Sequence, residues 1–166
     1  MQHAYDEHLA ENRYYDRHFQ IDAAKILPGE YFVTNSGMLL VTVLGSCVAA
    51  CIRDADSGLG GMNHFMLPDD GRRDAVGTSA RYGTYAMEIL INHLMKMGAR
   101  RNRLEAKVFG GGAVLESLSS SNVGVKNAEF VLDYLKTEKI PVVAKDLLDS
   151  YPRKVYYFPE TGRVLV

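Results

Sequence analysis

The residues best suited to do chemistry in this sequence are Cys47 and His64, which are 17 positions apart. A thiolate attacks carbonyl carbon, and a neighbouring imidazole can take up the thiol proton and later protonate the leaving group. Gly45 and Ser46 directly precede the cysteine and permit a tight backbone whose amides could face a developing oxyanion, an interaction worth about 3 to 4 kcal/mol per donor. The pattern predicts a cysteine-dependent hydrolase with Cys47 as nucleophile and His64 as base.

A β-hairpin would bring the two residues together. The runs GSCVAACIRD and LGGMNHFMLP read as two strands around a turn at residues 54–57, which places Arg53 opposite Gly58 and Cys47 opposite His64. Facing residues hold their Cβ atoms about 4.5 to 5.5 Å apart, whereas a slip of one residue would separate the pair. The run VAACI also suits the start of a helix, whose end would lower the thiol pKa, so strand and helix both stay open.

The only other cysteine, Cys51, has a simpler explanation. In the predicted hairpin it lies opposite Gly60 on the same face as Cys47, where it would serve as a small packed side chain. Cys47, Cys51 and His64 together would give zinc three ligands with no evident fourth, so we expect neither metal nor cofactor. Cys47 as a packed thiol and His64 as a hydrogen-bonded structural residue remain the alternatives to catalysis.

Composition limits the kinds of partner. The 166 residues hold 19 Lys and Arg against 20 Asp and Glu, so no broad basic surface favours nucleic acid or anionic lipid. No apolar run is long enough to span a membrane, and the first residues are polar where a signal peptide would be apolar. We therefore expect a cytoplasmic chain with no membrane insertion, acting on a protein or a small molecule.

The remaining pattern predicts one α/β domain. Apolar runs at 31–33 and 38–44, split by Asn35, Ser36 and Gly37, indicate a further hairpin, and apolar spacing predicts a helix from Thr78 or Ser79 to Met97, with Gly98 as its stop. Further strands are expected at 104–109, 140–144, 154–158 and 163–166, and a second helix at 127–137. Residues 1–24 read as a short helix or an arm before the domain, and the polar stretch 69–79 as a loop that could grip a substrate.

The sequence as a whole resembles a known family. The blocks TVLGSCVAACIRD, GGMNHFMLP, LEAKVFGGGAV, VGVKNAEFVLDYL and RKVYYFPETGRVLV, within residues 25–166, resemble the CheD family of chemoreceptor glutamine deamidases. The resemblance implies a compact α/β sandwich of mostly antiparallel strands with packed helices. It also implies hydrolysis of selected glutamine side-chain amides in methyl-accepting chemotaxis receptors to glutamate and ammonia, through a thioester on Cys47 with His64 as base.

The resemblance also suggests a third residue and further partners. The family has a catalytic threonine upstream of the cysteine, for which Thr42 is the candidate; in some members the threonine is one residue farther away, where this chain has Val41. Thr42 as a plain β-branched strand residue is the alternative. Glutamyl methyl esters are a related substrate, and some members bind a CheC-type phosphatase that competes with receptor. Two alternative functions are a non-catalytic regulatory module for receptors or the phosphatase, and a peptide-bond protease.

Overall fold

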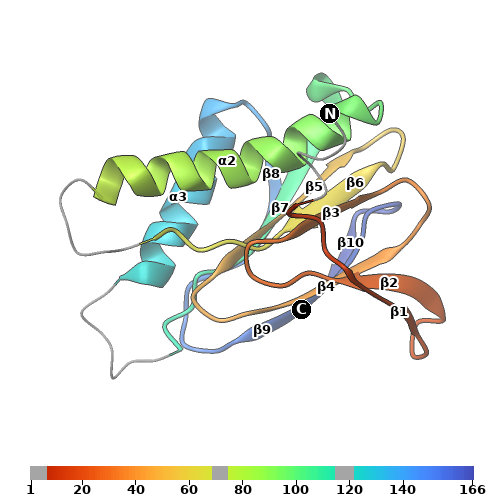
Figure 1. The fold of residues 1–166 in the computed structure, drawn as a ribbon, viewed down its shortest axis with the longest axis horizontal. Coiled ribbons are helices and arrows are strands. Elements are labelled where there is room, and N and C mark those ends of the chain that lie inside the picture. The colour runs from red at the N-terminus through yellow and green to blue at the C-terminus, as the bar shows by residue number, and fades with distance from the viewer. Residues whose placement is uncertain (1–6, 69–74, 115–121) are drawn as a thin grey trace.

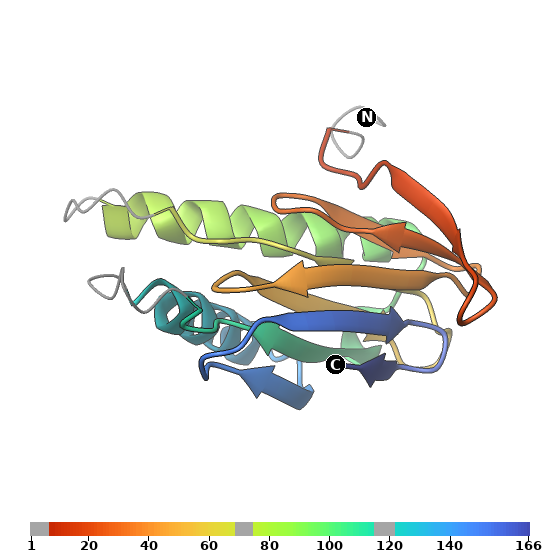
Figure 2. The same cartoon turned by 90° about the horizontal axis from the view of Figure 1, so that it is seen from below.

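The computed structural model describes residues 7–68, 75–114 and 122–166, which form three layers. Two helices cover one face of a first sheet, and a second sheet packs on its other face (Figures 1 and 2). The first sheet has the order β3-β6-β5-β7-β8 and the second β1-β2-β4-β9-β10. Among the strands of the described residues, only the pairs β2/β4 and β7/β8 are parallel. The expected α/β class with mostly antiparallel strands is confirmed for the described residues.

The elements have the following bounds. The strands are β1 Asn12–Asp16, β2 Ile21–Lys25, β3 Tyr31–Thr34, β4 Leu39–Leu44, β5 Val48–Asp54, β6 Gly60–Asn63, β7 Leu104–Gly110, β8 Val142–Leu147, β9 Arg153–Phe158 and β10 Arg163–Leu165. The helices are α2 Ala75–Lys96 and α3 Val123–Thr137, with a short 3-10 turn η1 at Arg101–Arg103. None of the helices in the described ranges is long and apolar enough to cross a membrane.

The hairpin predicted for residues 31–44 is wrong, although both of its strands exist. β3 belongs to the first sheet and β4 to the second, so the turn that contains Gly37 carries the chain from one sheet to the other. Phe32 of β3 and Leu40 of β4 both pack into the apolar core between the sheets. Because the strands lie in opposite sheets, Phe32 and Leu40 reach that core from its two sides.

The hairpin of β5 and β6 exists, but its register differs by two residues from the prediction. Arg53 pairs with Gly60 rather than Gly58, and Cys51 with Met62 rather than Gly60. Asp54 is the cause, because its carboxylate accepts the N–H groups of Asp56 and Ser57 and its own N–H bonds to the Leu59 carbonyl, which lengthens the turn. A shift of two residues preserves the face on which each side chain lies.

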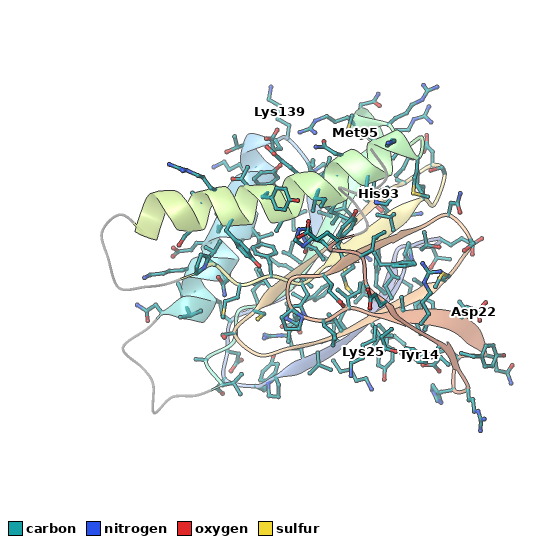
Figure 3. All side chains as sticks on the ribbon, viewed as in Figure 1. Tyr14, Asp22, Lys25, His93, Met95 and Lys139 are labelled. Carbon is teal, nitrogen blue, oxygen red and sulfur yellow. The ribbon has the colours of Figure 1, made fainter. Side chains whose placement is uncertain are left out.

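The amino-terminal segment lies in the second sheet. β1 and β2 form an antiparallel pair, and β2 runs parallel to β4 with Ala23 beside Leu39, so the described residues of this segment include two strands and no helix. The division into an arm at 1–24 and a domain at 25–166 stays a prediction, although β2 crosses that boundary. Figure 3 shows Tyr14, Asp22 and Lys25 at the margin of this sheet, far from the helices.

The helices pack on the first sheet through a narrower stripe than the sequence predicts. Apolar spacing places Tyr82, Ala86, Ile89, Leu90, Leu94 and Met97 on one stripe of α2, but Tyr82 and Met97 are exposed. The fully buried side chains of α2 are Met87, Leu90, Ile91 and Leu94. α2 begins at Ala75, so residues 75–79 of the predicted substrate-gripping loop are helical, while 69–74 lie outside the described residues. Gly98 follows the helix with a φ of 115°, as its predicted role as stop requires.

Candidate active site

His64 lies just after β6, where the hairpin begins to open. Its backbone pairs with the segment before β3 rather than with β5: the His64 N–H donates to the Glu30 carbonyl at 3.1 Å, and the Gly29 N–H donates to the His64 carbonyl at 2.8 Å. The side chain is 3% exposed and points into the space between the sheets, where it meets Thr42 of β4. Two sheets are thus needed to build this part of the site.

The hydrogen bonds around Thr42 determine which nitrogen of His64 carries the proton. Thr42 Oγ1 lies 2.6 Å from the carbonyl oxygen of Ile26 and 2.7 Å from His64 Nδ1. A carbonyl can only accept, so the single hydroxyl proton goes to Ile26, and Thr42 Oγ1 must accept a proton from Nδ1. The proton of a neutral His64 is therefore on Nδ1, and Nε2 keeps a free lone pair. Nε2 is buried and has no hydrogen-bond partner within the described chain.

Thr42 rather than Val41 occupies the position beside the histidine. Successive residues of β4 point to opposite faces, and Val41 is buried in the small cluster on the outer face of the second sheet. Thr42 faces the inside, where it is fully buried. The geometry therefore brings Thr42 and His64 together and leaves Val41 out.

Burial acts on the pKa of both candidate catalytic groups. Loss of solvation lowers the pKa of His64 from 6.5 to about 4, against a smaller opposite effect of the Ile26 carbonyl. Loss of solvation raises the pKa of the half-buried Cys47 thiol, and the N–H of Cys47 itself partly offsets that increase. Near neutral pH the free protein thus holds a thiol and a neutral imidazole, so the attacking thiolate named in the sequence analysis is not the resting form of Cys47.

Cys47 lies between a bend at Gly45 and Ser46 and the first residue of β5, so a strand and not a helix follows it. The adjacent glycine-rich stretch supports the bend from behind: the Gly111 N–H donates to the Cys47 carbonyl at 2.9 Å, and the Gly112 N–H to the Gly45 carbonyl at 3.0 Å. Gly110 has a φ of 110°, and a Cβ there would collide with the Cys47 carbonyl oxygen. These glycines allow close backbone packing beside the thiol.

The carbonyl of Ser46 is also bound on the buried side of this bend. Asn127 Nδ2 of α3 donates to it at 2.8 Å. In a trans peptide the N–H points opposite to the carbonyl, so the Cys47 N–H points away from α3, and it stabilises the charged form of its own thiol. An N–H near the sulfur is a candidate oxyanion donor. Gly45 and Ser46, predicted as oxyanion support, line the same cleft, and their carbonyls accept hydrogen bonds from the Gly112 N–H and Asn127 Nδ2; their role in oxyanion support stays a prediction.

Cys47 and His64 line one cleft of about 760 Å³. The β5/β6 register continues through a bridge between Val48 and Phe65, which makes Cys47 and His64 diagonal neighbours on one face rather than the directly opposed pair of the prediction. Both side chains belong to the space between the sheets. Exposed apolar side chains surround the cleft, namely Val43, Met66, Val114, Val125 and Leu148.

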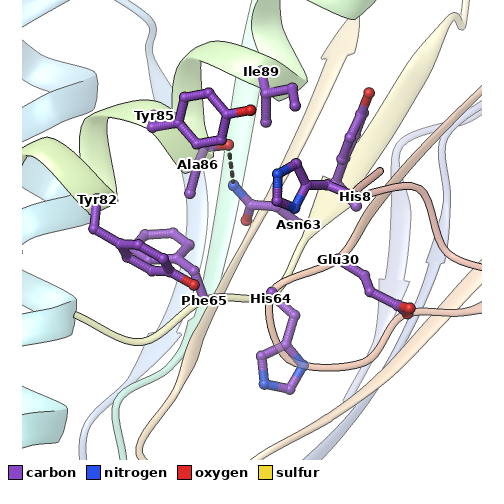
Figure 4. A pocket seen from close by; sticks show the side chains of 11 residues that line it. His8, Glu30, Asn63, His64, Phe65, Tyr82, Tyr85, Ala86 and Ile89 are labelled. Carbon is purple, nitrogen blue, oxygen red and sulfur yellow. Dashed lines mark hydrogen bonds between the residues drawn. The ribbon is translucent and has the colours of Figure 1, made fainter. Parts of the chain in front are cut away.

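A smaller cavity of about 210 Å³ lies on the other side of the His64 backbone, between β3 and α2. His8, Tyr82 and Tyr85 line it (Figure 4). Figure 4 also shows that the His64 imidazole points away from Tyr85. The described residues that line this cavity include no cysteine, serine or threonine, so the larger cleft with Cys47 is the candidate site.

Sequence reasoning missed three contributors to this arrangement: the Ile26 carbonyl, Asn63 and Asn127. Ile26 acts through its backbone, and the two asparagines bond to backbone atoms of β5 or the bend before it. No spacing signal marks such residues. Cys51 is buried in the core between the sheets, and no group of metal-ligating side chains occurs among the described residues.

The fold and the cleft define a two-sheet α/β sandwich with a thiol and an imidazole in one cleft. The family model described as CheD chemotactic sensory transduction matches residues 66–166, downstream of Thr42, Cys47 and His64. A probable chemoreceptor glutamine deamidase CheD 1 of Dechloromonas aromatica is 84% identical over 166 residues, which are 100% of this chain and 83% of that protein. The probable CheD of Janthinobacterium sp. is 67% identical over 96% of this chain and 80% of its own length. This chain belongs to the CheD family.

Proposed function

We propose that this protein hydrolyses glutamine side-chain amides of methyl-accepting chemotaxis receptors to glutamate and ammonia. The observation that carries the proposal is the shared cleft of Cys47 and His64, in which the Thr42 hydroxyl assigns a free lone pair to His64 Nε2. Relatives that cover nearly the whole chain are named as probable enzymes of this class. The alignments with these relatives span 100% and 96% of this chain, so they include Thr42, Cys47 and His64.

The proposed reaction starts from the neutral pair. His64 Nε2 takes the Cys47 proton as the sulfur attacks the amide carbon, and the Cys47 N–H stabilises the resulting oxyanion. The imidazolium then protonates the nitrogen, the C–N bond breaks, ammonia leaves and a thioester remains. Water attacks the thioester while Nε2 accepts its proton, and the proton returns to the sulfur as glutamate is released.

Thr42 has an orienting role in this proposal. By accepting from Nδ1 it holds the imidazole with Nε2 available to the thiol, and it stabilises the imidazolium that forms during the reaction. A glutamyl methyl ester would pass through a similar tetrahedral intermediate and release methanol instead of ammonia. Hydrolysis of methylated receptor belongs to the same proposal and is read out by the same analysis of receptor mass.

The proposal includes two kinds of protein partner. The receptor would enter the cleft with its glutamine side chain, and the exposed apolar side chains around the cleft would contact the receptor surface. A CheC-type phosphatase would compete for this protein, so adding one should slow receptor deamidation at limiting receptor concentration. A cytoplasmic location of the protein is part of this proposal.

The experiment that tests the function is mass spectrometry of a purified receptor signalling fragment after incubation with the protein. We expect conversion of specific glutamines to glutamates by the wild-type chain and by Cys51→Ala, and no conversion by Cys47→Ala. Cys51 is a matched control because it lies on β5, four residues after Cys47, but is buried between the sheets. Conversion by Cys47→Ala would refute the nucleophile, and a receptor cut in its backbone would indicate a protease instead.

A further inference from the structure

Asn127 joins the two segments that carry the candidate catalytic pair. It lies on α3 and is fully buried. Its Nδ2 donates to the carbonyl of Ser46, the residue before Cys47, at 2.8 Å, and its Oδ1 accepts the N–H of Leu67, three residues after His64, at 2.9 Å. One side chain therefore contacts both segments.

The strand register shows what these two bonds replace. Val48 and Phe65 exchange both of their backbone hydrogen bonds, each at 3.0 Å. In an antiparallel ladder the next pair of this kind lies two residues further along, which is Ser46 with Leu67. In this structure the amide of Asn127 takes up the Ser46 carbonyl and the Leu67 N–H. The two chains are thus spread apart at the cleft while their backbone groups stay satisfied.

The chemistry of the two backbone partners also fixes the orientation of the amide. The Ser46 carbonyl can only accept and the Leu67 N–H can only donate, so exchanging Oδ1 and Nδ2 would place like groups together. Holding the Ser46 carbonyl also fixes the peptide plane that points the Cys47 N–H away from α3. Asn127 thereby controls both the position of the thiol and the direction of its N–H.

We propose that Asn127 is a positioning residue that sets the spacing and alignment of Cys47 relative to His64 for the reaction. This inference rests on the proposed function. It assigns to Asn127 no contact with substrate: the side chain is fully buried and both ends of its amide are bonded to backbone. Its loss should lower kcat and leave KM nearly unchanged, because a misplacement of about 1 Å can cost about a hundredfold in rate.

The test measures how strongly His64 assists the reaction of Cys47 with a small probe. Iodoacetamide alkylation of Cys47 is timed at neutral pH in the wild-type chain and in His64→Ala, and the ratio of the two rates reports their coupling. The same ratio is then measured between Asn127→Leu and the double variant Asn127→Leu/His64→Ala. Leucine keeps the size of the side chain but removes both hydrogen bonds. We expect a ratio of about ten or more in the wild type and close to one in Asn127→Leu.

A matched control separates positioning from stability. Val131→Ala truncates a fully buried side chain one turn along the same helix and removes no hydrogen bond to either segment, so it should lower the unfolding free energy and preserve the alkylation ratio and kcat. A second variant, Asn127→Asp, keeps the Leu67 bond in both protonation states. Its neutral carboxyl can donate to Ser46 and its carboxylate cannot. Its kcat relative to wild type should therefore rise as the pH falls.

The outcomes are distinguishable. A wild-type alkylation ratio near one would refute the Cys47–His64 pair, and the positioning role would be overturned with it. A normal ratio in the wild type that persists in Asn127→Leu, with wild-type kcat, would overturn the role of Asn127 alone. Two results together would support the proposal. The alkylation ratio would fall to about one in Asn127→Leu but not in Val131→Ala, and the kcat of Asn127→Asp relative to wild type would rise at low pH.

Discussion

Replacing Thr42 by valine is the sharpest test of the hydrogen-bonded arrangement at His64. Valine has nearly the same shape, so the substitution removes one hydroxyl from a fully buried position. It leaves two buried groups without their partner, the carbonyl of Ile26 and the Nδ1–H of His64. An unsatisfied buried polar group costs about 1 to 3 kcal/mol, so the unfolding free energy should fall by about 1 to 5 kcal/mol after the gain from the added methyl group.

Activity should fall by more than the loss of stability explains. Without the Thr42 hydroxyl as acceptor, the proton of His64 can move from Nδ1 to Nε2 and the ring plane is less constrained. An Nε2 that carries the proton has no lone pair with which to accept the Cys47 proton. Loss of an imidazole's orienting partner costs about 10⁴ in kcat where that partner is a carboxylate, and we expect about a hundredfold for a hydroxyl.

The assay is the initial rate of receptor deamidation, measured beside urea unfolding of the same preparations. Thr42→Ser is the matched control, because it retains the hydroxyl and should keep activity within about tenfold of wild type while losing the packing of one methyl group. A Thr42→Val protein that is folded at the assay temperature and deamidates receptor at the wild-type rate would refute the orienting role.

Three further outcomes follow from the burial of the site. His64 has a pKa of about 4 in the folded chain against 6.5 as its ordinary value, so the unfolded state binds more protons between these values and stability falls as pH decreases through this window. Urea unfolding should show a loss of about 2 kcal/mol between about pH 7 and pH 4.5 that is absent in His64→Gln. The kcat/KM for receptor should rise with pH through about 4 and then stay level across neutral pH, whereas a second rise near 6.5 would contradict a neutral base. Iodoacetamide should label one thiol in the native chain and a second only in denaturant, because Cys51 is fully buried with its thiol pKa raised well above its usual range, and rapid native labelling of Cys51 would contradict its burial.

The sequence predicted the elements better than their connections. Periodicity located β4, β5, β7 and both helices because apolar spacing reflects which face is buried. It could not predict that β3 and β4 lie in opposite sheets, since a turn with Gly37 serves a hairpin and a crossing between sheets equally well. Which strands become neighbours is decided by the core between the sheets, and that core joins residues far apart in the chain.

In the candidate site, too, the sequence predicted the residues better than their arrangement. Cys47 and His64 were placed on one face of a hairpin, which holds, but the turn at Asp54 shifted the register by two residues and made them diagonal neighbours. The choice between Thr42 and Val41 depends on which side of β4 faces the first sheet, and the structure brings Thr42 to the histidine. Asn127 carried no signal, because an amide that bonds to backbone looks like any polar helix residue in sequence.

The opening of the hairpin at the cleft has a physical explanation in two side-chain amides. β5 and β6 pair regularly from Arg53 to Cys51, but at Ala50 the N–H donates to Asn63 Oδ1 at 2.8 Å instead of to a backbone carbonyl. Beyond Val48, the side-chain amide of Asn127 likewise takes the place of a backbone partner, for the Ser46 carbonyl and the Leu67 N–H. An unbroken ladder would use these backbone groups for regular pairing, and an opening without amides would leave buried groups unsatisfied at about 1 to 3 kcal/mol each. Side-chain amides on both sides of the Val48–Phe65 bridge account for the opening without that cost, and the candidate catalytic pair lies at this opening.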